Sequence, residues 1–274
     1  MSFRSFPGIR FSVTVLALSA LFAIPAQAAT LCTVIADAKT GDILVREGKC
    51  DARVTPASTF KIPLAVMGYD SGFLTDGHTP TLPFRKGDPD WGGDNWKQPT
   101  DAVRWLKYSV VWFSQRMTAH LGAEKLTDYA RRFDYGNADL SGDPGRNNGL
   151  ERAWIASSLK ISPIEQVTFL RRLINHQFRV SDAAVDRTVA VVEGRILASG
   201  WAVKGKTGMA YPRDAGGRFD RNHPWGWYVG WGKKGDRTIV FARLVRDDRK
   251  TAGSAGFRAR DSLFQELPSL LEHK

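Results

Sequence analysis

Residues 56–63, Pro-Ala-Ser-Thr-Phe-Lys-Ile-Pro, combine a hydroxyl and an amine at a spacing that suits nucleophilic catalysis. The opening proline indicates a helix start, and residues three apart share one helical face. We therefore expect Ser58 and Lys61 to point into the same space. A serine hydroxyl is a weak nucleophile until a base takes its proton. Lysine becomes such a base when apolar neighbours, which this segment supplies, lower its pKa.

The same Ser-x-x-Lys pattern occurs again at Ser157 and Lys160, so the pattern alone does not identify a catalytic pair. The plainer interpretation of either match is a helix-capping serine with a solvated lysine. Motifs elsewhere in the chain are needed to choose between the two interpretations.

Three more segments carry candidate side chains. Ser109 lies in the unusually apolar stretch 107–113. Its hydroxyl is either hydrogen-bonded within the core or a polar group in a cleft that excludes water. Trp154 follows a long loop rich in Gly, Pro and Asn, and loops of this length are often functional. Trp91 and Trp96 lie in the irregular stretch 76–100, where loop packing is a better interpretation than substrate stacking.

Composition limits the class of protein. The chain has 274 residues, 43% of them apolar, and a formal charge of +11. Its basic residues are scattered and no zinc-finger spacing or RNA-recognition signature occurs, so we expect a cationic surface and no nucleic-acid partner. The five histidines form no ligand pair at helical spacing, and we predict no metal site.

Residues 1–28 are typical of a secretory signal, with two early arginines, an apolar stretch and Ala-Gln-Ala at the end. The apolar stretch is short for a membrane span. We expect residues 29–274 to form a single exported catalytic domain without a stable membrane anchor.

Two cysteines, Cys32 and Cys50, flank a hairpin pattern with strands at 31–36 and 43–46. Antiparallel pairing would bring residue 32 opposite the late forties, and export permits oxidation. The pattern favours a Cys32–Cys50 disulfide over two buried free thiols, which stay the alternative.

The order of expected elements indicates an α+β fold. Helices are expected from 58 to about 70, over 100–122, over 123–133, from a capping box at Ser162, over 181–193 and over 256–271. Strands are expected at 200–209, 225–231 and 237–245. This order predicts an antiparallel sheet flanked by terminal helices, with a mainly helical subdomain inserted at roughly 62–195.

Four short motifs occur in one order along the chain: Ser58-x-x-Lys61, Ser109-x-Val111, Tyr135-Gly136-Asn137 and Lys206-Thr207-Gly208. Together they resemble the serine penicillin-recognising enzymes, most closely the class D β-lactamases. The run Trp-Tyr-Val-Gly-Trp at 227–231 is similar to a strand of that family. Around Trp154 the chain departs from the family, with Ala153 in place of an aromatic residue and Ala-Ser-Ser at 156–158 in place of a glycine or acid.

The resemblance implies hydrolysis of the β-lactam ring of penicillin- and oxacillin-type antibiotics. CO2 would carboxylate Lys61, which would then act as general base for acylation of Ser58 and for deacylation. Ser109 would relay a proton to the leaving nitrogen, with help from Lys206. No cofactor is implied apart from CO2 or bicarbonate.

The resemblance also implies the substrate-binding residues: Val111, Trp154, Thr207, Gly208, Met209 and Arg258. Trp154 would donate its indole N–H to the carboxylated lysine. Thr207 and Arg258 would hold the substrate carboxylate, with Arg260 as a close alternative for Arg258. The N–H groups of Ser58 and Met209 would form an oxyanion hole. We expect the protein to be periplasmic or secreted and to be a monomer or a homodimer.

Other functions share these motifs. A penicillin-binding DD-peptidase or a β-lactam sensor domain would acylate but turn over slowly, and a sensor would normally carry a transmembrane signalling region. A cationic wall- or nucleic-acid-binding module would make the motifs accidental. Repeated turnover of one substrate distinguishes hydrolysis from all of these.

Overall fold

The computed structural model describes residues 1–2, 28–214 and 216–272. Its six strands form one antiparallel sheet in the order β2-β1-β6-β5-β4-β3. The strands are β1 (Ala29–Asp37), β2 (Ile43–Gly48), β3 (Gly194–Ile196), β4 (Ala202–Ala210), β5 (Trp225–Lys234) and β6 (Arg237–Arg246). The first two strands are separated in sequence from the last four by a helical region. This arrangement confirms the predicted fold class.

The N-terminal hairpin has the predicted register. Cys32 lies opposite Gly48, and Cys32 is bonded to Cys50, with their Cα atoms 5.1 Å apart. The disulfide therefore joins β1 to the segment that leads from β2 to the Ser58 turn.

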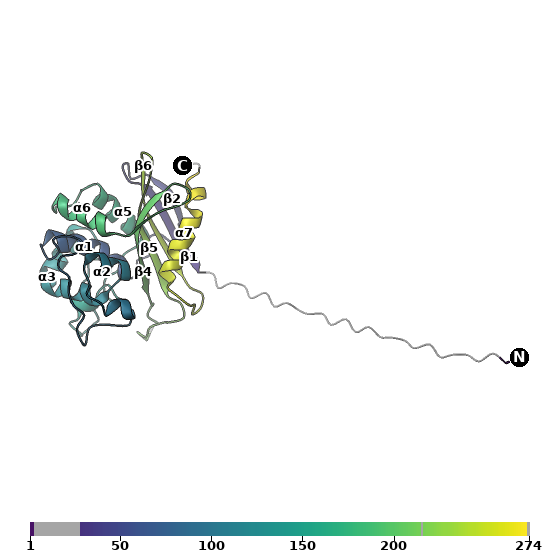
Figure 1. Cartoon of the computed structure of the whole chain (residues 1–274), viewed down its shortest axis with the longest axis horizontal. Helices are drawn as coiled ribbons and strands as arrows, with labels where there is room; N and C mark the ends of the chain where they lie inside the picture. The colour runs from purple at the N-terminus through teal and green to yellow at the C-terminus, as the bar shows by residue number, and fades with distance from the viewer. Residues whose placement is uncertain (3–27, 215, 273–274) are drawn as a thin grey trace.

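Helix α7 (Ala255–Leu271) covers one face of the sheet (Figure 1). Its buried residues Ala259, Leu263 and Leu267 recur every four positions and pack with Phe241 and Tyr228 of the sheet. Residues four apart lie on one helical face, so a single apolar stripe is sufficient to attach the helix.

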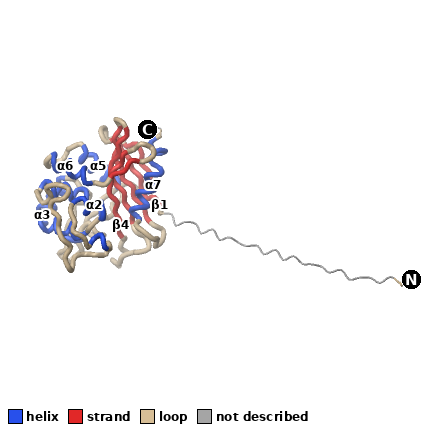
Figure 2. Tube along the Cα trace, in the orientation of Figure 1, coloured by secondary structure: helices blue, strands red, loops and turns tan. Residues whose placement is uncertain are grey.

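The other face of the sheet supports the helical region (Figures 1 and 2). Its α-helices are α1 (Lys61–Asp70), α2 (Ala102–Tyr108), α3 (Val111–Arg132), α4 (Gly149–Arg152), α5 (Pro163–Ile174) and α6 (Asp182–Val191), with 3-10 turns η1 (Ala57–Phe60) and η2 (Asp94–Trp96). Ser162 and Glu165 form the predicted capping box of α5. The helices and the sheet share one large hydrophobic core.

Several elements differ from the sequence prediction, among them the short helix α4 in a stretch expected as a loop. The helix expected over 100–122 is interrupted, because Ser109 adopts a left-handed conformation with φ 57° and ends α2. The helix expected over 181–193 ends at Val191, and the short strand β3, which was not predicted, follows it. Three residues carry too little periodicity to reveal a strand.

The proposed secretory signal lies almost wholly in residues 3–27, outside the described residues. Within the described part of the chain, no helix is long and apolar enough to cross a membrane.

Candidate active site

Ser58 lies in η1 and Lys61 begins α1, so the helix expected from 58 starts as a 3-10 turn. Lys61 Nζ is 3.5 Å from Ser58 Oγ. The lysine side chain is only 1% exposed, although Ser58 is partly open to solvent. The arrangement places an amine that is shielded from bulk solvent next to a hydroxyl that solvent can reach.

The turn that carries Ser58 packs directly against β4 at Gly208. A Cβ on Gly208 would lie 3.0 Å from the Pro56 carbonyl oxygen and 3.3 Å from the Ser58 amide nitrogen. These distances are tighter than most real Cβ contacts, so glycine permits the close approach of β4. The backbone of β4 thereby runs beside the amide of the candidate nucleophile.

Burial disfavours a charge on the Lys61 amine. The Phe60 ring stacks on the Trp154 ring with centroids 5.5 Å apart, and Val111 is buried in the same core. Burial lowers the pKa of Lys61 well below its ordinary value of 10.5, and the positive charge of Lys206 lowers it further. Both effects favour the neutral form of this amine, relative to that of a solvated lysine.

Ser109 and Lys206 come together from separate parts of the fold. Lys206 Nζ donates a hydrogen bond to Ser109 Oγ over 2.6 Å and a second to the Thr207 carbonyl oxygen over 3.2 Å. Lys206 is 5% exposed, and burial lowers its pKa to about 8, while Glu193 opposes that shift. Near neutral pH the Lys206 side chain is mostly protonated and donates to the serine oxygen.

Thr55, which the sequence analysis missed, holds Trp154 in place. Its hydroxyl donates to the Trp154 carbonyl oxygen over 2.8 Å and accepts from the Ala156 N–H over 3.0 Å. The Thr55 carbonyl in turn accepts from the Trp227 indole over 2.9 Å. One buried threonine thus joins the segment before Ser58, the Trp154 loop and β5, and no local sequence pattern marks it.

A second missed group lies behind Ser58. Gln166 donates to the Thr59 hydroxyl over 2.8 Å, and Thr59 donates to the Pro56 carbonyl oxygen over 2.8 Å. Tyr135 approaches Gln166 to 3.4 Å and lies 5.5 Å from the Phe60 ring, centroid to centroid. These buried hydrogen bonds fix the turn that presents the nucleophile.

The Tyr-Gly-Asn motif has a structural role in this arrangement. Asn137 exchanges two hydrogen bonds of 2.9 Å with the backbone of Lys160. Gly136 has φ 60°, and a Cβ there would collide with the Lys160 carbonyl oxygen. The motif therefore anchors the far end of the loop that carries Trp154.

The second Ser-x-x-Lys match is part of that loop. The Ser157 hydroxyl donates to Asp143 over 2.8 Å, and Lys160 is exposed. Neither residue has the buried surroundings that lower the pKa of Lys61. This difference favours the first match as the catalytic pair.

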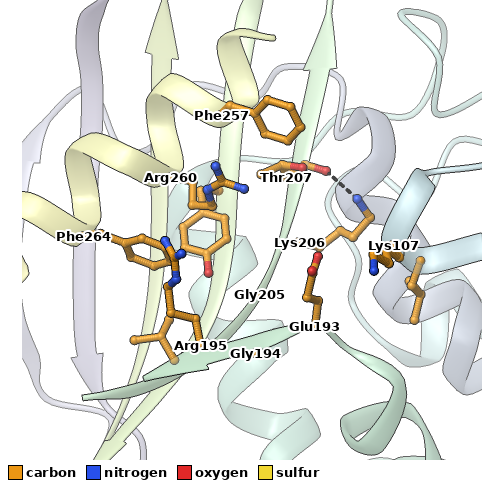
Figure 3. Close-up of a pocket in the computed structure, with 13 residues that line it drawn as sticks. Lys107, Glu193, Gly194, Arg195, Gly205, Lys206, Thr207, Phe257, Arg260 and Phe264 are labelled. Carbon is orange, nitrogen blue, oxygen red and sulfur yellow. Dashed lines mark hydrogen bonds between the residues drawn. The ribbon is translucent and has the colours of Figure 1, made fainter. Parts of the chain in front are cut away.

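The two candidate arginines on α7 have different surroundings. Arg258 forms a bidentate pair with Asp247, which is 2% exposed, and donates to the Ala252 carbonyl oxygen over 3.0 Å. Arg260 donates to Asp261 over 2.8 Å and lines a cavity beside Thr207 (Figure 3). Arg258 is thus held rigidly, whereas Arg260 borders open space next to the Lys206-Thr207 segment.

The tryptophans of the irregular loop have separate roles. Trp96 is buried and donates to the Tyr108 carbonyl oxygen over 2.8 Å, immediately before Ser109. This contact agrees with loop packing. Trp91 lies 5.4 Å from the Trp96 ring, centroid to centroid, and is 63% exposed.

Comparisons with known proteins agree with this geometry. Residues 31–269 match the family described as penicillin binding protein transpeptidase domain. The chain is 45% identical to β-lactamase OXA-9 of Klebsiella pneumoniae over 89% of each sequence, and 36% identical to β-lactamase OXA-1 of Escherichia coli over 78% of this chain and 75% of that protein. The crystal structure of OXA-427, a class D β-lactamase with 45% identity, covers 88% of this chain and 98% of its own with a TM-score of 0.82.

Proposed function

The chain belongs to the class D β-lactamases, and we propose that it hydrolyses penicillin- and oxacillin-type antibiotics through an acyl-enzyme on Ser58. The observation that carries the residue assignment is the buried Lys61 amine, 3.5 Å from the Ser58 hydroxyl. Relatives named as β-lactamases over most of their length favour a hydrolase over a slow transpeptidase or sensor.

Lys61 acts as the base after its Nζ is carboxylated. Only a neutral amine attacks CO2, forming an N–C bond and releasing one proton. Burial and the charge of Lys206 both lower the pKa of Lys61, so they favour the neutral amine. The stacked rings of Phe60 and Trp154 would line the pocket around the carboxylated side chain, and the burial of Lys61 favours its retention.

Acylation moves one proton and exchanges one bond. The carboxylated Lys61 accepts the Ser58 proton while Ser58 Oγ bonds to the lactam carbonyl carbon. The C–N bond then breaks, and the proton taken up by the carboxylated Lys61 passes to the nitrogen through Ser109, to which Lys206 donates. This transfer restores the base for deacylation. The N–H groups of Ser58 and Met209 stabilise the oxyanion, an interaction whose loss typically costs about 100- to 1000-fold in turnover.

Deacylation uses the same base with water as the nucleophile. The carboxylated Lys61 takes a proton from water, the water oxygen attacks the ester carbon, and Ser58 leaves with the proton. The apolar surroundings that the buried Val111 supplies favour retention of the carboxylated lysine. A slow transpeptidase lacks this modification, so its retention favours hydrolysis.

The substrate carboxylate binds at the β4 end of the site. Thr207 offers a hydroxyl, and Gly208 allows the strand to approach the nucleophile turn. Arg258 supplies a forked donor whose orientation Asp247 holds, with Arg260 as the alternative beside the cavity. Export by the signal at 1–28 to the periplasm or medium brings the enzyme to its substrates.

The test is steady-state turnover of a chromogenic cephalosporin combined with intact-mass analysis. We expect many turnovers per molecule for the unmodified chain, and neither acylation nor turnover for Ser58→Ala. Ser157→Ala is the matched control, since it removes the serine of the other Ser-x-x-Lys pattern, and it should still acylate. A single stoichiometric burst would instead assign the protein as a sensor or transpeptidase.

A further inference from the structure

A cavity of about 320 Å³ lies beside the candidate active site, on the α7 side of β4 (Figure 3). Lys206 and Thr207 line it, so it borders the place proposed for the substrate carboxylate. Ser58, Lys61 and Trp154 do not line it. The cavity is therefore an extension of the site rather than the site of acylation.

The cavity exists because β3 is short. The ladder between β3 and β4 ends at Gly194 and Lys204, with one further hydrogen bond of 3.1 Å from the Gly205 N–H to the Glu193 carbonyl oxygen. Strand β4 continues beyond that point to Lys206 and Thr207. Helix α7 supplies one wall through Phe257, Arg260 and Phe264, which share a helical face. The open edge of β4 and this helical face enclose a space larger than a single carboxylate requires.

The charged side chains around this space are mostly positive. Lys107, Arg195, Lys206 and Arg260 carry positive charge, and Glu193 is the one acidic residue among the lining residues. Glu193 extends toward Lys206, and its charge opposes the lowering of the Lys206 pKa (Figure 3). Asp261, outside the lining, pairs with Arg260.

Aromatic rings position two of these cations. The Arg260 guanidinium lies 4.7 Å from the Phe257 ring centroid, and that of Arg195 lies 5.9 Å from the Phe264 centroid. Such contacts restrain the cations at the wall. Asp261 offsets part of the Arg260 charge, and Arg195 adds to the excess of positive charge. The wall therefore presents positive charge to whatever enters.

We propose that this cavity binds the substituent on the second ring of a β-lactam, the ring fused to the lactam, and that it favours an anionic substituent. The inference rests on the proposed function, because Thr207, which lines the cavity, would contact the carboxylate of that ring. A substituent on the same ring then extends along the β4 edge toward Arg195 and Glu193. The cations there stabilise a second negative charge on the substrate.

The experiment compares two cephalosporins that share one acyl side chain and differ only in a neutral or an anionic substituent on the six-membered ring. The measured quantity is the ratio of kcat/KM for the anionic compound to that for the neutral one. Arg195→Gln should lower this ratio about two- to fivefold, and Glu193→Gln should raise it by a similar factor. Both effects should shrink at high salt, a response that a purely structural role would not produce.

Lys125→Gln is the matched control, because it removes one positive charge from an exposed position of α3 that does not line the cavity. Its ratio should equal that of the unmodified enzyme. An equal loss for both substrates in Arg195→Gln, or an unchanged ratio in both cavity variants, would overturn the proposal while leaving hydrolysis intact. Failure of the unmodified enzyme to turn over either compound would overturn the proposed function and this inference with it.

Discussion

Lys206 Nζ donates a hydrogen bond of 2.6 Å to Ser109 Oγ across a sequence separation of 97 residues. Ser109 is available for this contact because it leaves the helical conformation at the end of α2. Lys206 is available because it lies on the part of β4 beyond the end of the β3 ladder. The contact joins the helical region to the sheet at the site.

We expect both Ser109→Ala and Ser109→Gly to lower turnover about 100- to 10,000-fold, because both remove the hydroxyl proposed to carry a proton to the leaving nitrogen. The two variants should differ in stability. Residue 109 has φ 57°, which costs an alanine about 1 kcal/mol or more relative to glycine. Kinetics and denaturant unfolding check these two expectations, and near-normal turnover in either variant would remove Ser109 from the mechanism.

The pH dependence of kcat/KM should show a fall above about pH 8. Burial lowers the pKa of Lys206 to about 8, and only the protonated side chain carries the positive charge that assists Ser109. Raising the pH through this pKa therefore removes the charge and lowers the rate. Glu193 raises the pKa of Lys206, so Glu193→Gln should move the fall to lower pH. A fall that begins only near 10.5, the ordinary pKa of lysine, would contradict the effect of burial.

Activity should decrease when bicarbonate is removed and return when it is added. The reason is that the Lys61 amine, whose pKa is lowered by burial, is proposed to act as a base only after it has been carboxylated. Carbon-13 NMR of enzyme supplied with labelled bicarbonate should show one carbamate signal, and Lys61→Ala should lack it. Turnover that is indifferent to bicarbonate, with no such signal, would exclude the carboxylated lysine.

Arg213 connects the β4–β5 loop to the loop that carries Trp154. It donates to Asp143 over 2.8 Å and to the Ala156 carbonyl oxygen over 3.0 Å. We expect Arg213→Gln to lower the free energy of unfolding by about 1 kcal/mol at most, since the pair is partly exposed, and to increase proteolytic cleavage in both loops. Arg218→Gln is the control, because Arg218 is 87% exposed and its ion pair among the described residues is with Asp214 of the same loop. Equal cleavage of the two variants would show that the connection does not restrain the loops.

The Cys32–Cys50 disulfide should contribute to stability. It closes a segment with a sequence separation of 18, for which the restricted unfolded chain predicts about 3 kcal/mol. The double variant Cys32→Ala/Cys50→Ala should lose about that much in denaturant unfolding. Reductant should add the mass of two hydrogens to the unmodified chain and nothing to the double variant; an unchanged mass in the unmodified chain would mean that the bond had not formed.

Much of the fold could be predicted because its signals are local. The hairpin around the two cysteines, the capping box at Ser162 and the apolar stripe of α7 each depend on residues a few positions apart. The break at Ser109 could not be predicted in the same way. The apolar periodicity continues across it, and serine carries no local signal for the left-handed conformation that it adopts there.

The features of the candidate site also separate into those that depend on local sequence and those that depend on contacts between distant segments. The sequence by itself determined that Ser58 and Lys61 share a face, because a spacing of three residues places them together in any helical turn. Only the tertiary structure decided that Lys61 is buried, that Lys206 reaches Ser109, that Thr55 holds Trp154 and that Arg260 borders a cavity while Arg258 binds Asp247. The physical reason is that burial and contacts between distant segments depend on how whole elements pack, which short-range periodicity does not encode.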